Sequence, residues 1–490
     1  MRGILTIAFG LVFSGQLAAQ TFTVLHSFTA TPADTPFTNT DGAFPYAGVT
    51  LSSNTLYGAT TRAGHWENGT LFKMKTDGTD FTVIHHFSAA QFDPVSTGST
   101  NTDGAFPYGT LVFANEVLYG TTLSGGSFGD GTVFRINSDG TGFQALHHFG
   151  PISRSGSPAT NEDGAFPKAS LVLDGDVLYG TTELGGINAS GIVFRINIDG
   201  SGFTNLHSFI SGDIDGARPV GNLLLVDSTL YGTTAAYGTT NYGTVFAINL
   251  DGSEFRNVHV LRGNEAAFPY GGLVFEGGTF YGTTIGGGSS FYGTVFAIDA
   301  ETTHCRTLHS FTVMESGTNM DGALPYCSLI FSNQMLYGTA ELGGERGSGT
   351  VFAVNADGTR FVTLHTFSLT SDSRGRGTNV DGSAPDGPLV RDGNTLYGTA
   401  KYGGQGGSGT AFSLSFVPQL TIIPYGTSVI ITWPTNFAGF DYMDFILQST
   451  TNLTPPTSWT PASSMPVVIG GQRVVIDNIS ANQRFYRLAQ

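Results

Sequence analysis

The chain has 490 residues, a formal net charge of −16 and only 12% charged residues. Its 21 lysines and arginines form no basic stripe, which excludes a protein that binds the nucleic-acid backbone. The 38 phenylalanines and 18 tyrosines recur periodically, which excludes a disordered chain, and together with 69 glycines they favour an all-β protein with tight turns.

The first 19 residues are typical of a secretory signal peptide. Arg2 precedes an apolar core that runs from Ile4 to Phe13, and Ala18 and Ala19 supply the small residues expected at a cleavage site. This core is too short to cross a bilayer, and no other stretch approaches the roughly 18 apolar residues that a membrane span needs. We therefore predict an exported protein without a transmembrane segment.

A repeat dominates the rest of the chain. The tripeptide Leu/Phe-Tyr-Gly occurs seven times, with steps of 50 to 62 residues between its tyrosines, which are Tyr57, Tyr119, Tyr179, Tyr231, Tyr281, Tyr337 and Tyr397. A repeat of this length is one supersecondary unit that must stack on its neighbours. In the second copy, four short runs rich in Val, Phe, Tyr and Thr alternate with glycine-rich turns, at residues 109–114, 117–123, 131–137 and 143–149. Each copy therefore predicts four antiparallel strands, A to D, and Asp139-Gly140 predicts a type I′ turn between C and D.

The two ends of the repeat region complement each other. Strand D ends in a Leu-His-x-Phe-like signature whose seven histidines are His26, His85, His147, His207, His259, His309 and His365. The first lies at residues 21–28, before any strand A, whereas the last copy stops after its strand C at residues 409–416. The N-terminal strand is thus predicted to complete the last unit. The result is a seven-bladed β-propeller over residues 20–416, closed so that no sheet edge stays open.

A different pattern follows the repeats. Residues 417–490 contain no Leu-Tyr-Gly copy, and their candidate strands lie at 420–424, 428–433, 444–449, 473–476 and 484–488. With Trp433 and Trp459, this spacing predicts a small β-sandwich of fibronectin III or immunoglobulin-like type, without the immunoglobulin cysteine pair.

The repeat resembles a known family. The strings that carry the resemblance are Leu118-Tyr119-Gly120-Thr121-Thr122, Gly125-Gly126, Gly131-Thr132-Val133-Phe134, Asp139-Gly140 and Leu146-His147-His148-Phe149. They resemble the GloVer tandem repeat of exported bacterial "choice-of-anchor" proteins, and the match covers residues 21–416. The fifth copy departs at Glu301-Thr302 and the fourth at Arg218-Pro219. The resemblance implies export, a repeat architecture and a separate C-terminal module, and it brings no activity.

The two cysteines occupy different repeat positions. Cys305 stands in strand D, where other copies have phenylalanine, and Cys327 stands in strand A, where others have Gly109 or Gly271. An exported protein allows a disulfide. Strand A is innermost and strand D outermost in a propeller blade, however, so we favour two buried thiols that are too far apart to bridge.

Two repeated polar motifs are candidate sites. The seven strand-D histidines are spread around the ring, so we interpret them as partly buried groups that hold neighbouring blades together by hydrogen bonds. No ligand spacing for a metal occurs, and no cofactor or metal is predicted. The motif Asn-x-Asp-Gly precedes most strands A and is interpreted as a turn. Calcium is the alternative, with Asp213 and Asp215 as the best ligands, although calcium needs about six to eight oxygens.

The longer B–C and D–A loops vary between copies, and strand direction places them on one face. Binding usually resides in loops carried on a rigid scaffold. This face predicts a candidate ligand surface of Trp66, Phe128, Asp130, Glu183, Tyr237, Tyr242, Tyr292, Glu341 and Tyr402. Aromatics with sparse carboxylates suit a glycan or a protein partner, and the alternative is that these side chains fill the space between loops.

The preferred function is an exported, monomeric, non-enzymatic propeller that binds an extracellular glycan or protein, with the C-terminal module as spacer or attachment. The first alternative is a polysaccharide-acting enzyme at the channel mouth, where Glu183 and Glu341 would have to face each other at about 5 to 9.5 Å. Arg62 and Lys401 at the equivalent positions favour salt bridges instead, and no other catalytic motif occurs. A purely structural envelope protein is the second alternative.

Overall fold

The computed structural model describes residues 18–32, 36–93, 98–152, 160–212, 215–372, 377–454, 457–462, 464–478 and 483–489. Among these residues it contains strands, turns and bends but no helix, which confirms the all-β prediction. No helix capable of crossing a membrane is therefore found in the described part of the chain. Residues 1–17 of the predicted signal peptide lie outside the described residues. The first strand, β1 (Ala18–Ser27), begins at Ala18.

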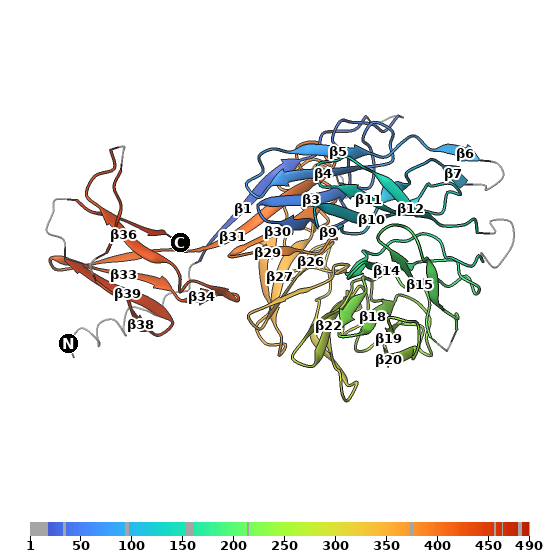
Figure 1. The fold of residues 1–490 in the computed structure, drawn as a ribbon. Coiled ribbons are helices and arrows are strands. Elements are labelled where there is room, and N and C mark those ends of the chain that lie inside the picture. Colours follow the sequence, from blue (N-terminus) through green and yellow to red (C-terminus); the bar gives the residue numbers. More distant parts are fainter. Residues whose placement is uncertain are drawn as a thin grey trace. The chain divides into compact units, whose positions relative to one another are not determined.

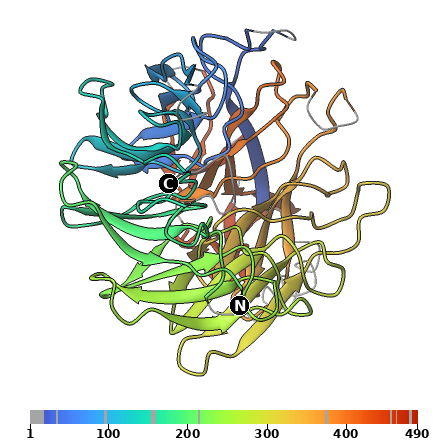
Figure 2. The same cartoon turned by 90° about the vertical axis from the view of Figure 1, so that its right-hand side faces the viewer.

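Contacts divide the chain into two units. The larger comprises Thr23–Val390 and Tyr397–Ser413, and the smaller comprises Met1–Phe22, Arg391–Leu396 and Leu414–Gln490. The repeats form antiparallel sheets in the order expected for strands A to D, and Figure 2 shows these sheets following one another in chain order from blue to orange.

Seven such sheets are present in the described residues. Sheet 1 has β2 (Thr50–Ser52), β3 (Thr55–Thr60), β4 (Thr70–Lys75) and β5 (Thr82–His86); sheet 2 has β8 (Ala105–Pro107), β9 (Val112–Ala114), β10 (Val117–Ser124), β11 (Thr132–Asn137) and β12 (Gln144–His148). Sheet 3 has β13 (Val172–Asp174), β14 (Val177–Thr182), β15 (Ile192–Asn197) and β16 (Thr204–Ser208); sheet 4 has β17 (Leu224–Val226), β18 (Thr229–Thr234), β19 (Thr244–Asn249) and β20 (Arg256–Val260). Sheet 5 has β21 (Val274–Glu276), β22 (Thr279–Thr284), β23 (Thr294–Asp299) and β24 (Cys305–Ser310); sheet 6 has β25 (Ile330–Ser332), β26 (Met335–Ala340), β27 (Thr350–Asn355) and β28 (Val362–Thr366). Sheet 7 has β29 (Val390–Asp392), β30 (Thr395–Ala400), β31 (Thr410–Pro418) and β1.

Sheet 7 joins the two ends of the repeat region. Its order is β1-β31-β30-β29, so the predicted pairing of the N-terminal strand with the last copy is confirmed (Figure 1). The Phe28 N–H donates to the Gly409 carbonyl at 3.0 Å, and the Thr399 hydroxyl of sheet 7 donates to the Ala47 carbonyl, just before sheet 1, at 2.7 Å.

The turns of the repeat follow from backbone conformation. Between β9 and β10, Asn115 and Glu116 both have positive φ, at 51° and 61°, as a type I′ turn requires. The prediction of a type I′ turn at Asp139-Gly140 is wrong. There only Gly140 has positive φ, at 93°, and the Asp139 carboxylate accepts the Thr141 N–H at 2.8 Å. An aspartate that accepts the N–H group two residues later favours a longer loop ending in a glycine bulge over the two-residue type I′ turn.

Two features of the second repeat are absent from the sequence prediction. Strand β10 extends to Ser124 and pairs with β8, and a separate hairpin forms from β6 (Gln91–Asp93) and β7 (Gly98–Thr100). These segments are only three residues long and lack an apolar pattern, so periodicity could not reveal them.

Core clusters lie between consecutive sheets, so sheets 2 to 5 are covered on both faces. One core cluster joins Tyr119 and Phe149 of the second repeat to Leu178 and Phe194 of the third, and Phe194 is fully buried. Full burial of such a side chain contributes about 2 to 3 kcal/mol. This two-sided burial explains why the strands show no clean alternation of apolar and polar residues.

The strand-D histidine and the aspartate of the following loop form a recurrent pair. In six repeats the ring Nε2 lies 2.8 to 3.1 Å from a carboxylate oxygen, in the pairs His26–Asp41, His85–Asp103, His147–Asp163, His207–Asp215, His309–Asp321 and His365–Asp381. Five of these rings stack on a phenylalanine of the next sheet, with ring centres 3.6 to 4.2 Å apart. The pairs are His26 and Phe81, His85 and Phe143, His147 and Phe203, His207 and Phe255, and His309 and Phe361. The histidines therefore hold neighbouring repeats together in two ways: by stacking on a ring of the next sheet and, as predicted, by a hydrogen bond to the loop that leads into that sheet.

The Asn-x-Asp-Gly motif forms a turn, as predicted. The Asn39 Oδ1 accepts the Gly42 N–H at 2.7 Å and the Gly64 N–H at 3.1 Å, while its Nδ2 donates to the Gly42 and Thr29 carbonyls. The aspartate of the motif is the partner of the histidine. The motif thus ties the loop before strand A to both neighbouring loops.

Both cysteines are free and buried, which bears out the prediction of two thiols. Cys305 begins β24, the last strand of sheet 5, and Cys327 lies before β25, the first strand of sheet 6. The Cys327 sulfur accepts the Thr339 N–H at 3.1 Å.

The C-terminal segment forms two further sheets and a short hairpin. One sheet has β32 (Thr421–Tyr425), β33 (Ser428–Pro434), β39 (Gln472–Asn478) and β38 (Val467–Ile469), and the other has β37 (Thr460–Pro461), β36 (Ile446–Thr450) and β40 (Phe485–Ala489). The hairpin is β34 (Asn436–Phe437) with β35 (Phe440–Asp441). Trp433, Val475 and Leu447 belong to one core cluster that draws on both sheets, as a β-sandwich requires. The finer prediction of a fibronectin III or immunoglobulin-like module stays a prediction.

Candidate functional site

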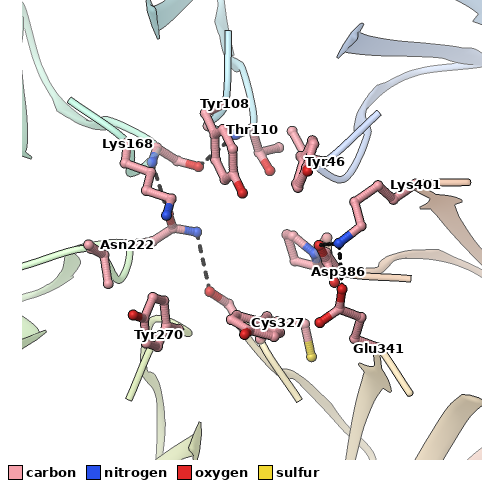
Figure 3. Close-up of a pocket in the computed structure, with 18 residues that line it drawn as sticks. Tyr46, Tyr108, Thr110, Lys168, Asn222, Tyr270, Cys327, Glu341, Asp386 and Lys401 are labelled. Atoms are coloured by element: carbon pink, nitrogen blue, oxygen red, sulfur yellow. Dashed lines mark hydrogen bonds and ion pairs between the residues drawn. The ribbon is translucent and has the colours of Figure 1, made fainter. Parts of the chain in front are cut away.

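A pocket of about 380 Å³, here called the central pocket, is lined by residues from all seven repeats. Its wall contains the residue that directly follows the proline of each repeat, namely Tyr46, Tyr108, Lys168, Val220, Tyr270, Tyr326 and Asp386. Figure 3 shows five of these side chains, those of Tyr46, Tyr108, Lys168, Tyr270 and Asp386, around one space and on separate segments of the chain. Equivalent positions of a repeated scaffold therefore carry four tyrosines, one cation, one carboxylate and one apolar side chain.

The backbone before each proline places these side chains. The pre-proline residue has a φ between 54° and 60° in every repeat, a left-handed conformation that non-glycine residues rarely adopt. Its N–H donates to a carbonyl of the preceding repeat at 2.8 to 2.9 Å, in the pairs Phe44–Ser408, Phe106–Asn68, Phe166–Asp130, Arg218–Ser190, Phe268–Tyr242, Leu324–Tyr292 and Ala384–Ser348. Such backbone strain persists only where surrounding contacts hold it. The first of these bonds links the first repeat to the last.

One side of the pocket is a buried charge cluster. The Lys401 ammonium lies 2.5 Å from the Glu341 carboxylate and 2.8 Å from that of Asp386, and its side chain is 6% exposed. The second carboxylate oxygen of Asp386, Oδ1, is buried and has no hydrogen-bond partner. Burial raises the pKa of Asp386 above its usual range, although Lys401 opposes the shift. For Lys401 burial alone would lower the pKa, but the two carboxylates raise it well above the ordinary value.

The opposite side carries a cation over aromatic rings. The Lys168 ammonium lies 4.9 Å from the ring centre of Tyr108 and 5.7 Å from that of Tyr270. Burial lowers the pKa of Lys168. Among the described residues this ammonium has no ion pair, so it is the cation of the pocket that remains available to a ligand.

Four repeats add a polar side chain to the pocket two residues further along, namely Thr110, Ser170, Asn222 and Ser328. The Thr110 N–H donates to the Ser170 hydroxyl at 2.8 Å, and the Ser170 N–H donates to the Asn222 side-chain oxygen at 2.9 Å. The Asn222 amide in turn reaches the Ser328 hydroxyl at 3.2 Å (Figure 3). The pocket therefore combines aromatic walls with a fixed set of hydroxyl, amide, ammonium and carboxylate groups.

The exposed aromatics of the predicted ligand surface lie outside this pocket. Trp66, Phe128 and Tyr237 are 55%, 39% and 45% exposed. Trp66 lines a second pocket, of about 550 Å³, together with Phe92 and Phe106.

The other predicted aromatics are half-buried among loops. The Tyr402 ring lies 5.1 Å from that of Phe44, and the Tyr242 ring lies 5.8 Å from that of Phe268. Tyr292 packs against the core cluster between sheets 5 and 6. These contacts are those expected of the space-filling alternative, and a binding role of the three tyrosines stays a prediction.

The predicted carboxylates have different environments. Asp130 is fully buried, and its Oδ2 accepts the Ile152 N–H at 3.0 Å, so its placement on an exposed ligand surface is wrong. A hydrogen-bonding role inside a loop explains this burial. Glu183 pairs with Arg218, whose Nε lies 3.0 Å from the Glu183 carboxylate, which is the predicted kind of salt bridge. Of the predicted set, Glu341 alone lines the central pocket.

The proposed cation loop receives no support at Asp215. This residue is buried, and its carboxylate accepts hydrogen bonds from His207 and from the Ile210 N–H, both at 2.8 Å. Asp213 lies outside the described residues.

The pocket tyrosines, Lys168 and Asp386 are not among the site residues predicted from the sequence. The signal that could have found them is the alignment of the repeats on their prolines, where the following position changes between aromatic, basic, apolar and acidic residues. A variable position on a constant scaffold is typical of a binding site.

Comparison with known families shows to which family the repeats belong. A family model described as the Gloeobacter/Verrucomicrobia repeat matches residues 8–161 and 154–323. The chain belongs to this repeat family. None of the curated proteins searched matches the chain.

The solved structures that match the chain share little sequence with it. The extracellular domain of a one-component system from B. thetaiotaomicron is 12% identical, with a TM-score of 0.46, over 85% of this chain and 46% of that one. Oligogalacturonate lyase from Vibrio parahaemolyticus is 10% identical, with a TM-score of 0.45, over 82% of this chain and 98% of that one. A chain of the nidogen/laminin complex is 15% identical, with a TM-score of 0.37, over 61% of this chain and 90% of that one.

Proposed function

We propose that the seven sheets close into a propeller with the pocket at its centre. The pairing of β1 with β31 and the Phe44–Ser408 hydrogen bond, both between the first and last repeats, support this closure. Deletion of residues 20–28 tests it. The loss of a strand from the closing sheet should lower the unfolding temperature more than deletion of the tail, residues 419–490, and equal effects would contradict closure.

The function that the geometry supports best is the binding of a short saccharide in the central pocket by an exported, non-enzymatic protein. The observation that carries this proposal is the convergence of Tyr46, Tyr108, Tyr270 and Tyr326 on one space that also holds free polar groups. Sugar rings present apolar C–H faces to aromatic rings and hydroxyl groups to polar side chains, so both parts of the wall find a partner.

The polar groups suit a ligand that both donates and accepts hydrogen bonds. The Glu341 carboxylate lines the pocket with its side chain 17% exposed and can accept a sugar hydroxyl, and the Lys168 ammonium can donate to a hydroxyl or to a carboxylate of an acidic sugar. A volume of about 380 Å³ falls within the range of small-molecule sites and limits the ligand to a short saccharide or a chain end.

Isothermal calorimetry with neutral, N-acetylated and uronic-acid di- to tetrasaccharides tests the proposal on the mature chain. We expect Tyr46→Ala and Tyr270→Ala each to weaken the binding of the best saccharide at least about tenfold, which corresponds to about 1.4 kcal/mol. Tyr237→Ala is the matched control, because Tyr237 is exposed and lies outside the pocket lining. Binding to none of the saccharides, or an equal loss in the control, would overturn the assignment.

The enzyme alternative has one observation in its favour, which is the raised pKa of Asp386 beside the pocket. Both Asp386 and Glu341 contact the same ammonium, however, and a neutralised pair is poorly suited to act as acid and base. A reducing-end assay on the saccharides that bind distinguishes the two functions, since turnover that Asp386→Asn abolishes would identify an enzyme. We propose the C-terminal sandwich as a spacer or attachment module of fibronectin III or immunoglobulin-like type, and a monomer as the working state.

A further inference from the structure

The junction between sheets 4 and 5 differs from the other repeats in two residues. Glu265 stands where the other histidines pair with aspartate, and its Oε1 lies 2.8 Å from His259 Nε2. Cys305 stands where other histidines stack on a phenylalanine, such as Phe361 on His309. The longer acid and the smaller sulfur side chain together replace a carboxylate–histidine–phenyl stack with three groups that can bind a metal.

These three groups converge on one point. One ligand atom from each of His259, Glu265 and Cys305 lies within 4.8 Å of the other two. The Cys305 side chain is buried, whereas His259 and Glu265 are 18% and 20% exposed. An ion could therefore enter from the solvent side and meet a sulfur at the inner end.

The hydrogen bonds of His259 prepare its ring as a ligand. Nδ1 lies 3.1 Å from the Thr303 carbonyl, and a carbonyl can only accept, so Nδ1 carries a proton. In the neutral ring the Nε2 lone pair then faces the Glu265 carboxylate, and only a proton or a cation between them makes this contact favourable. A ligating histidine in proteins commonly donates its other N–H to such a second partner, which orients the ring.

We propose that His259 Nε2, a Glu265 carboxylate oxygen and Cys305 Sγ bind Zn²⁺, with water as the fourth ligand. Imidazole, carboxylate and thiolate are the ligands of zinc, whereas a thiolate disfavours calcium and magnesium. Zinc–ligand bonds of about 2.0 to 2.3 Å place neighbouring ligand atoms roughly 3.3 to 3.7 Å apart in a tetrahedron. The Glu265 oxygen thus has to move away from Nε2 by about 0.5 Å, and no two ligand atoms have to approach each other by more than about 1.5 Å.

Binding replaces the thiol proton by the metal, and this proton leaves to solvent. Burial, with a smaller contribution from Glu265, raises the pKa of the Cys305 thiol to about 12 in the metal-free protein. Metal affinity should therefore fall as the pH falls, because the proton competes with the ion.

Cobalt titration of the full mature chain, after removal of metal with EDTA, tests the site. A Co²⁺–thiolate bond gives a charge-transfer absorption in the near ultraviolet, and a tetrahedral site gives visible d–d bands. We expect one equivalent of Co²⁺ to produce these bands and one equivalent of Zn²⁺ to remove them.

Two variants separate the site from general thiol chemistry. Cys305→Ser should weaken Co²⁺ binding at least tenfold and remove the charge-transfer band. The matched control Cys327→Ser should keep both, because Cys327 is the other buried free thiol and lies outside the cluster.

A third variant guards against misfolding. Glu265→Asp combined with Cys305→Phe restores the arrangement of His309, Asp321 and Phe361, so the fold should persist, with an unchanged circular dichroism spectrum, while Co²⁺ binding is lost. The proposal is overturned if the wild-type chain shows no thiolate band, if Cys305→Ser keeps the band, or if Cys327→Ser loses it.

Discussion

The pair of Asp321 and His309 offers a direct test of what holds the repeats together. The Asp321 carboxylate is buried and accepts three donors: His309 Nε2 at 2.9 Å, the Thr312 N–H at 3.0 Å and the Thr312 hydroxyl at 2.5 Å. Asp321→Ala leaves all three donors without this partner. A hydrogen bond to a charged group contributes about 1.5 to 3 kcal/mol.

Water limits the loss, since the His309 side chain is 19% exposed. We assign one of the three hydrogen bonds its full energy and the other two a smaller energy, because water can replace part of them. On this basis we expect Asp321→Ala to lower the free energy of unfolding by about 3 kcal/mol. Urea unfolding followed by circular dichroism measures the loss, and hydrogen exchange of the Thr312 amide locates it.

Asp163 is the matched comparison. Its side chain is 23% exposed, and its carboxylate accepts His147 Nε2 and the Gly150 N–H, both at 2.9 Å. With one donor fewer and more water, Asp163→Ala should cost about 1 to 2 kcal/mol. Asp139→Ala, at an exposed turn, should have the smallest effect. If Asp163→Ala destabilised the protein as much as Asp321→Ala, the buried carboxylate would not be the origin of the stability.

Three further perturbations have defined outcomes. Lys401→Met leaves Glu341 and Asp386 as buried carboxylates without their cation. It should lower the free energy of unfolding by about 3 kcal/mol at pH 7, measured by urea unfolding against a Lys75→Met control. The loss should be smaller at pH 5, where Asp386 takes up a proton. Burial would raise the pKa values of Asp41, Asp103 and Asp321, but hydrogen bonds from histidine and from serine or threonine lower them below 3.8. The contribution of these carboxylates to the free energy of unfolding is therefore complete above pH 3.8 and is lost as the pH falls below it. Acid unfolding that stays unchanged in Asp321→Asn would contradict this. Burial, and then the neighbouring His65, lowers the pKa of His86 to about 4. The stabilisation by neutral His86 is therefore complete above pH 6.5 and declines as the pH falls from 6.5 towards 4. The unfolding temperature of His86→Gln should depend less steeply on pH in this window, and an unchanged dependence would count against the reasoning.

The repeated motifs were recognisable without coordinates, but their pairing was not. Both the strand-D histidine and the Asn-x-Asp-Gly aspartate stand out in the sequence, yet the separation between partners varies from 8 residues for His207 and Asp215 to 18 for His85 and Asp103. Loops of unequal length hide a constant geometry, because only the folded backbone brings the two ends to the same place. The same reason explains the hairpin of β6 and β7, which lies within one such loop.

The predicted ligand surface shows where loop reasoning is insufficient. It correctly identified exposed aromatics such as Trp66 and Tyr237, and it included Glu341 of the central pocket. It also included Asp130, which is buried, since a polar residue in a glycine-rich loop can face either solvent or the loop's own amides. Composition does not distinguish these two environments.

By itself the sequence determined the β class, the seven repeats and the partner of the N-terminal strand, because strand periodicity and turn residues act over short distances along the chain. Only the tertiary structure decided that the residue after each proline faces a shared pocket, and that Lys401 neutralises Glu341 and Asp386. Residues as distant in the chain as Tyr46 and Asp386 meet through the relative orientation of sheets, and that orientation depends on packing between repeats that no local pattern encodes.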